Sequence, residues 1–132
     1  MNGKKLEKHI QNEIINFLRT LDIFCWVNKT QGTYDPVKRV FRRNPAMMKG
    51  VSDVLGIVGG RFLAIEVKTD VGRVSPEQRV FLARVSTEGG IAFVARSVQD
   101  VAVNLSKFFP DNIGLKKMAT GEVHLPQSRL DQ

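Results

Sequence analysis

The fold is decided by residues 51–68, which read VSDVLGIVGGRFLAIEVK. Two runs rich in β-branched and apolar residues are separated by two glycines, which predicts a β-hairpin with a two-residue turn. If Val58 faces Arg61 across this turn, the same register places Asp53 opposite Glu66. Residues directly opposite each other have Cβ atoms about 4.5–5.5 Å apart, and like charges at that distance are destabilising. The predicted register therefore requires a compensating cation.

Lys68 supplies part of that compensating charge. Because side chains alternate between the two faces of a strand, Lys68 shares the face of Glu66 while Val67 points away. Two carboxylates beside a backbone carbonyl make an all-oxygen site that suits Mg²⁺ or Mn²⁺ and suits zinc poorly. Such an ion can polarise a phosphoryl oxygen and lower the pKa of a bound water, and the Lys68 ammonium could orient that water. The stretch predicts a site for phosphodiester hydrolysis.

Each of these residues also has a purely structural interpretation. Asp53 by itself, near a strand start, is typical of a turn or capping residue, and Glu66 with Lys68 could form an exposed ion pair worth under about 1 kcal/mol. Glu66 decides between the interpretations because it lies in a strand that is otherwise apolar on both faces. A buried acid without a partner would cost several kcal/mol there, so the constellation favours a functional site.

The composition indicates one globular domain with a polyanionic partner. The chain has 132 residues, of which 42% are hydrophobic, enough for one core. Its net charge of +7 and pI near 9.9 favour nucleic acid or an anionic membrane surface. The membrane is disfavoured because no basic amphipathic helix carries bulky apolar residues opposite its charges. Without an apolar run near the roughly 20 residues of a membrane span, or a secretory signal, we expect a soluble cytoplasmic protein.

Cysteine and histidine usage argues against zinc chemistry. Cys25 is the only cysteine and lies in an apolar run, which excludes an intramolecular disulfide and a multi-cysteine zinc site. We expect it to be a buried structural thiol. His9 and His124 are far apart in the sequence and lack ligand spacing, so both are expected at the surface.

Periodicity along the chain predicts an α/β fold. Apolar residues recur at helical spacing over 6–21, and the short apolar run 23–28 suits a strand, with a further short strand at 37–41. A helix over 76–88 leads into a strand over 91–95, and such strand-helix-strand units are parallel and right-handed in nearly all cases. A last helix begins at Ser97. The order is roughly α-β-(β)-β-β-α-β-α, with one mixed sheet flanked by helices.

Two further polar residues are candidates for the same site. Ser75 begins a capping box that Gln78 closes, yet Gln78 also lies on the sheet-facing side of its helix and could reach the catalytic edge. The two roles are compatible. Glu13 lies beside Ile10 and Phe17 at helical spacing, so it could add a third carboxylate to the ion. An exposed helix acid is the alternative for Glu13.

The C-terminal segment carries a weaker pattern than the rest of the chain. Residues 110–132 have few periodic apolar positions. We expect them to form a loosely ordered tail, or an arm that packs only on a partner subunit. The predicted nuclease domain therefore covers residues 1–109.

A group of cations leads directly into Asp53. Phosphate contacts position DNA without reading its sequence and weaken with salt, so these residues predict a clamp for the DNA backbone, with a merely soluble basic loop as the alternative. The clamp residues are Lys29, Lys38, Arg39, Arg42, Arg43 and Lys49, joined by Arg73 and Arg79 near the start of the second helix.

These motifs together closely resemble the virus-type replication-repair nuclease (VRR-NUC) domain, a branch of the PD-(D/E)XK nuclease superfamily. The resemblance covers about residues 5–105, and the residue before the aspartate, often proline in the family, is Ser52 here. The motifs that carry it are Glu13, Lys49-Gly50-Val51-Ser52-Asp53, Ile65-Glu66-Val67-Lys68 and Gly72-Arg73-Val74-Ser75-Pro76-Glu77-Gln78.

The resemblance implies a restriction-endonuclease-like core and divalent-metal cleavage of DNA. Asp53, Glu66 and the Val67 carbonyl would be metal ligands, Lys68 catalytic, and Glu13 and Gln78 supporting residues. Stand-alone domains of this family from phages resemble Holliday-junction resolvases and act as homodimers, so we expect branched DNA, a DNA-repair role, a bacterial or phage source and a homodimer. The leading hypothesis is a Mg²⁺- or Mn²⁺-dependent, structure-selective DNA endonuclease. The competing hypothesis is a non-catalytic DNA-binding module on the same fold.

Overall fold

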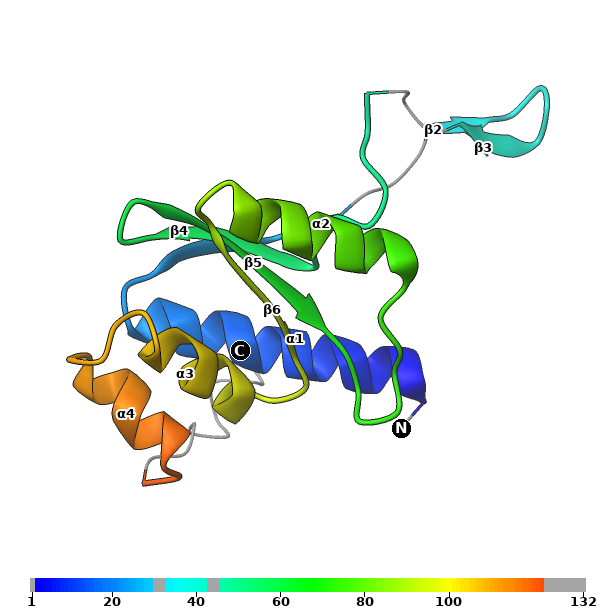
Figure 1. Ribbon diagram of the computed structural model, residues 1–132. Helices are drawn as coiled ribbons and strands as arrows, with labels where there is room; N and C mark the ends of the chain where they lie inside the picture. Colours follow the sequence, from blue (N-terminus) through cyan, green and yellow to red (C-terminus); the bar gives the residue numbers. More distant parts are fainter. Residues whose placement is uncertain (1, 30–32, 43–45, 123–132) are drawn as a thin grey trace.

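A four-stranded mixed sheet covered by helices forms the body of the protein (Figure 1). The computed structural model describes residues 2–29, 33–42 and 46–122. The helices are α1 (Gly3–Thr20), α2 (Pro76–Thr87), α3 (Val98–Ser106) and α4 (Ile113–Ala119). The strands are β1 (Phe24–Val27), β2 (Thr33–Asp35), β3 (Val40–Arg42), β4 (Val54–Val58), β5 (Arg61–Val67) and β6 (Ile91–Ala95).

The main sheet has the order β1-β4-β5-β6. β4 pairs with β1 and with β5 in antiparallel fashion, and β5 pairs with β6 in parallel, as predicted for the strand-helix-strand unit. Val58 faces Arg61 and Val54 faces Ile65, which confirms the predicted hairpin register. α2 covers one face of the sheet, while α1 and α3 cover the other (Figure 1).

The core lies between the sheet and the helices α1, α3 and α4. β5 is one of the two inner strands, and its residues Leu63, Ile65 and Val67 are fully buried. The inward residues predicted for the last helix, Val98, Val101, Ala102 and Leu105, are all buried. Cys25 is a buried free thiol, as expected, and burial raises its pKa, which makes the reactive thiolate rarer.

The segment between β1 and β4 differs from the prediction of a single strand over 37–41. β2 and β3 form a separate two-stranded hairpin that projects from the body (Figure 1). Residues 36–39 form its turn, and Arg39 adopts a positive φ of 54° there. The prediction of a strand over 37–41 is wrong because the chain reverses inside this run, and only Val40–Arg42, which begins within it, is extended.

α4 lies within the range expected to be a loosely ordered tail. Asn112 caps it by accepting a hydrogen bond from the Leu115 backbone, and Leu115 and Met118 are buried in the core. Two inward positions in a seven-residue helix give too short a period to detect in the sequence. The packed body therefore extends through α4. Among the described residues, no helix is both long enough and apolar enough to cross a bilayer.

Candidate active site

Asp53 stands immediately before β4, in the position that the hairpin register places opposite Glu66. Its Oδ2 accepts a hydrogen bond from the Val67 backbone N–H at 3.0 Å. Its own carbonyl accepts a hydrogen bond from the Asn28 N–H at 2.8 Å, which ties Asp53 to the chain leaving β1. Asp53 is thus fixed from both sides, and it reaches the peptide that joins Glu66 to Val67.

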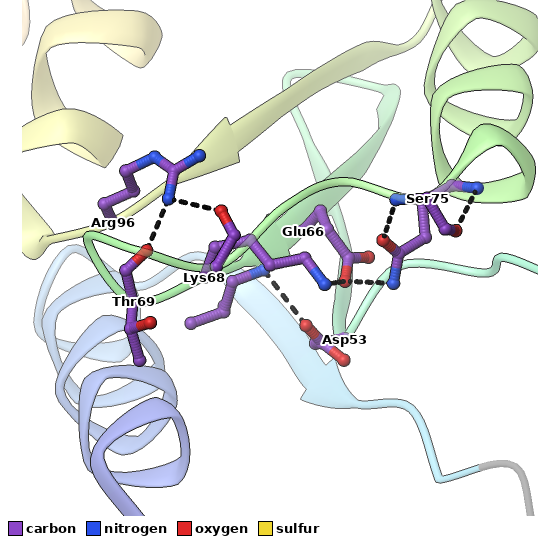
Figure 2. Close-up of polar contacts among 9 residues, drawn as sticks. Asp53, Glu66, Lys68, Thr69, Ser75 and Arg96 are labelled. Carbon is purple, nitrogen blue, oxygen red and sulfur yellow. Dashed lines mark hydrogen bonds and ion pairs between the residues drawn. The ribbon is translucent and has the colours of Figure 1, made fainter. Parts of the chain in front are cut away.

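Glu66 is a buried acid, only 1% exposed, and its pKa is raised to about 8. Burial is the main cause, followed by repulsion from Asp53, while the charge of Lys68 lowers the pKa. The Lys68 Nζ lies 3.6 Å from Glu66 Oε1 (Figure 2). The two acids and the lysine therefore form one interacting group, as the sequence predicted. The single ammonium does not cancel the effects of burial and of the Asp53 charge, because the pKa of Glu66 stays raised.

Gln78 makes both of the contacts expected of it, one within the capping box and one to the acids. Its Oε1 accepts a hydrogen bond from the Ser75 N–H at 2.9 Å, and its backbone N–H donates to the Ser75 hydroxyl, which completes the capping box. Its Nε2 donates to Glu66 Oε1 at 2.8 Å (Figure 2). Because the cap occupies the amide oxygen, the amide nitrogen must face the acid. The start of α2 thereby orients Glu66.

Position 50, three residues before Asp53, requires a glycine because its backbone conformation and its close neighbours leave no room for a side chain. It has a φ of +79°, and a Cβ at this position would lie 2.4 Å from the backbone carbon and oxygen of Glu77 and 2.7 Å from the Gln78 nitrogen. The chain leading to Asp53 therefore passes directly against the backbone of the first turn of α2. This contact sets the distance between Asp53 and the helix that carries Gln78.

Glu7, rather than Glu13, is the acid of α1 that lies near this group. Burial and the charge of Asp53 raise the pKa of Glu7, and the charge of Lys68 lowers it. Glu13 instead pairs with His9, with 2.9 Å between Oε1 and Nε2. Helical geometry explains the difference from our expectation, because Glu7 lies about two turns before the buried Ile14, on the same stripe, whereas six residues separate Glu7 from Glu13 and do not make whole turns.

The oxygens of the two acids suit a divalent cation. Glu66 Oε2 is buried and has no hydrogen-bond partner among the described residues. A buried carboxylate oxygen left without a donor is costly, and a hard cation would satisfy it. Among residues 2–29, 33–42 and 46–122, no cluster of three or more His, Cys, Asp or Glu side chains could hold a metal ion. The side-chain ligands at hand are therefore Asp53 and Glu66, with the Val67 carbonyl adjacent in sequence.

The raised pKa of Glu66 predicts a pH-dependent stability in EDTA. The folded protein keeps a proton on Glu66 up to about pH 8, whereas the unfolded chain loses it near the ordinary value of 4.5. This stabilisation is complete below the unfolded pKa and is lost as the pH rises towards 8. We expect the melting temperature of the wild type to fall more between pH 5.5 and 8 than that of Glu66→Gln, which stays neutral. Equal slopes for both proteins in a melting series would contradict the assignment.

The predicted clamp cations lie in several places around the body. Lys38 and Arg39 are exposed in the turn of the β2–β3 hairpin, and the backbone of Arg42 belongs to β3. Arg43, like His124, lies outside the described residues. The remaining predicted cations, Lys29, Lys49, Arg73 and Arg79, are exposed.

A basic groove beside Asp53 was missed by the sequence analysis. Lys4, Lys8 and Lys29 line a surface groove of about 390 Å³ together with Glu7 and Asn28. Asn28 is the residue whose backbone N–H donates to the Asp53 carbonyl, so the groove includes a residue in direct contact with Asp53. The spacing of Lys4 and Lys8, one helical turn apart and next to Glu7, is the signal that could have revealed it.

The fold and the paired acids define a nuclease domain of the PD-(D/E)XK class. The sequence profile of the VRR-NUC domain matches residues 6–99, more than two thirds of the chain, and the protein belongs to this family. No curated protein gives a significant match. Membership makes the chain a nuclease-type domain with DNA as its substrate.

Proposed function

We propose that this nuclease is a Mg²⁺- or Mn²⁺-dependent endonuclease that cleaves branched DNA, in the manner of Holliday-junction resolvases, and that it acts as a homodimer. The observation that carries the metal dependence is Glu66, a buried acid beside Asp53 with one oxygen that no donor of the described residues satisfies. The ligands offered by Asp53 and Glu66 are oxygens, which favour a hard divalent cation, and binding of such a cation would displace the proton that Glu66 holds below about pH 8.

Each residue of the site has a definite task in this proposal. Asp53, Glu66 and the Val67 carbonyl would hold the ion, which when bound lowers the pKa of water and polarises the phosphoryl oxygen. Lys68 orients the attacking water and offsets the charge that develops on the phosphate, since its ammonium already lies 3.6 Å from Glu66. Gln78 keeps Glu66 in one orientation through its 2.8 Å hydrogen bond.

The arrangement of cations supports binding governed by DNA shape and charge. The groove of Lys4, Lys8 and Lys29 would carry one DNA backbone to the acids, while the projecting β2–β3 hairpin would bring Lys38 and Arg39 to a second segment. Two separate basic surfaces suit DNA whose arms diverge at a branch point. A homodimer, which the family resemblance implies, would supply two such sites for the two strands of a junction.

The experiment that tests the proposal is a cleavage assay on labelled DNA structures. Four-way junctions, flaps, nicked duplexes and linear duplexes are incubated with the purified protein over a series of Mg²⁺ and Mn²⁺ concentrations and in EDTA. We expect metal-dependent cleavage of the branched substrates and none in EDTA. Binding to all four substrates without cleavage at any metal concentration would favour the alternative of a non-catalytic DNA-binding module.

Arg42, the last residue of β3, and Arg43, the next residue in the sequence, provide a separate prediction for DNA binding. Replacing Arg42 and Arg43 with alanine removes two phosphate contacts, so the slope of log K against log salt should become shallower by about 2, with affinity lost equally for all DNA shapes. Replacing Lys116 and Lys117, two exposed cations of α4, removes the same charge elsewhere and serves as the control. An unchanged salt slope in the Arg42/Arg43 variant would remove these residues from the binding surface.

A further inference from the structure

The loop between β5 and α2, residues 68–75, connects the two halves of the active site. It begins with Lys68 and ends with Ser75, the residue that caps α2 and forms the capping box with Gln78. The loop has little apolar packing of its own, since Asp70 is exposed and Val71 is 89% exposed. Hydrogen bonds must therefore fix its conformation.

Arg96, far along the sequence, supplies those bonds. It follows β6 directly, and its Nη1 donates to the carbonyl oxygens of both Thr69 and Gly72 (Figure 2). The Gly72 N–H in turn donates to the Thr69 carbonyl at 3.1 Å, so the guanidinium bridges the two ends of one tight turn. A charged donor makes such bonds roughly twice as strong as neutral ones.

Arg96 is itself held at the end of the sheet. Its backbone N–H donates to Asp100 Oδ2 at 2.8 Å, in the first turn of α3. The preceding residue, Ala95, accepts a hydrogen bond from the Lys68 N–H at 3.1 Å, which continues the pairing of β5 with β6 by one residue. The turn and Lys68 are thus both tied to two consecutive residues at the end of β6, Arg96 and Ala95.

The turn held by Arg96 supports the side chain of Lys68. A Cβ added at Gly72 would lie 3.3 Å from Lys68 Cδ and 3.4 Å from Lys68 Cβ, so the turn lies against the aliphatic stem of the lysine. The stem carries the ammonium that lies 3.6 Å from Glu66. A displaced turn would leave this long side chain free to choose other rotamers.

We propose that Arg96 is a positioning residue for catalysis, which acts through the turn 69–72 to aim the Lys68 ammonium at the acids. The inference rests on the proposed function, because Lys68 has a task there only if the site hydrolyses DNA. Arg96 does not touch the acids itself, so its removal should change the rate of the cleavage step and leave DNA affinity intact.

The test compares Arg96→Gln and Arg96→Lys under single-turnover conditions, with DNA affinity measured separately in EDTA. We expect Arg96→Gln to cleave about 10- to 100-fold more slowly at unchanged affinity, because small displacements of a reacting group cost rates of this order. A single nitrogen, Nη1, makes both bonds, and the lysine ammonium is also a charged donor, so Arg96→Lys should recover part of the lost rate. Cleavage by Arg96→Gln at the wild-type rate would overturn the inference.

Arg61→Gln is the matched control. Arg61 also donates to a backbone carbonyl, that of Gly89 at 2.9 Å, but it stands at the opposite end of β5 and is exposed. Its replacement should leave the cleavage rate unchanged. If both variants lost rate and melting temperature together, Arg96 would have only a structural role and the inference would be wrong.

Hydrogen exchange separates a failure of this inference from a failure of the proposed function. The amides of Lys68 and Gly72 are hydrogen-bonded, and in Arg96→Gln they should exchange faster while those of the core strands do not change. If the wild type cleaves no DNA, the proposed function fails, and unchanged exchange in Arg96→Gln would still refute the turn contact.

Should Arg96→Gln not fold, Gly72→Ala displaces the Lys68 stem from the same turn, and an unchanged rate there would overturn the inference.

Discussion

Asp53→Asn should abolish DNA cleavage, with a rate at least about 10³-fold below that of the wild type, which corresponds to roughly 4 kcal/mol of the activation barrier. Asparagine is isosteric with aspartate and keeps an oxygen that can accept the hydrogen bond from the Val67 N–H. It removes the negative charge that a divalent cation needs. The variant should therefore fold and bind DNA as before, yet fail in the chemical step.

The same substitution should also change the pKa of the neighbouring acid, Glu66. Repulsion from Asp53 is the second largest cause of the raised pKa of Glu66, so Asp53→Asn should lower that pKa. Single-turnover cleavage, DNA affinity and the pH dependence of melting are the three measurements. Asp111→Asn, an exposed aspartate before α4, is the control and should behave as the wild type. Cleavage that persists in Asp53→Asn, or in excess EDTA, would rule out the metal mechanism.

Gly50→Ala should destabilise the protein and disrupt the site at the same time. Alanine at a φ of +79° carries backbone strain of about 1–2 kcal/mol. In addition, its methyl group would overlap the Glu77 backbone at 2.4 Å, so α2 or the segment before Asp53 must move. We expect a total cost of about 3 kcal/mol or more, which lowers the melting temperature by roughly 10 °C.

Gly60→Ala separates strain from overlap. Gly60 has a similar φ of +75°, but a Cβ there would meet no atom of the described residues within 4 Å. The control should therefore show only the strain, with a smaller loss of stability and normal cleavage. If the two variants melted at the same temperature and cleaved DNA equally well, the close contact between Gly50 and α2 would have no energetic consequence, and the account of this glycine would be incorrect.

The sequence alone predicts those parts of the fold and of the site whose interactions are local or follow the alternation of side chains along a strand. The two-glycine turn fixed which residues face each other in the β4–β5 hairpin, and the alternation of faces then placed Glu66 and Lys68 on one side. The serine cap of α2 revealed Gln78 for a similar reason, because the capping box involves residues only three apart.

The sequence was insufficient where a residue acts across the fold. The choice between Glu7 and Glu13 depends on which end of α1 reaches Asp53, and both acids fit an amphipathic helix. Arg96 donates to two backbone carbonyls. Because every residue has a backbone carbonyl, the residue types do not reveal these contacts. α4 was missed because it buries only Leu115 and Met118.

Catalytic competence in this protein depends on its least buried long helix. None of the residues of α2, all of them described, is fully buried, and Val80 is 69% exposed. The helix is joined to Glu66 through the amide of Gln78, and it buries no residue fully that could hold its first turn once the Ser75 capping box opens. Mild warming or low denaturant should therefore abolish cleavage while the hydrophobic core is still intact. The activity would then report on the first turn of α2 and not on global folding.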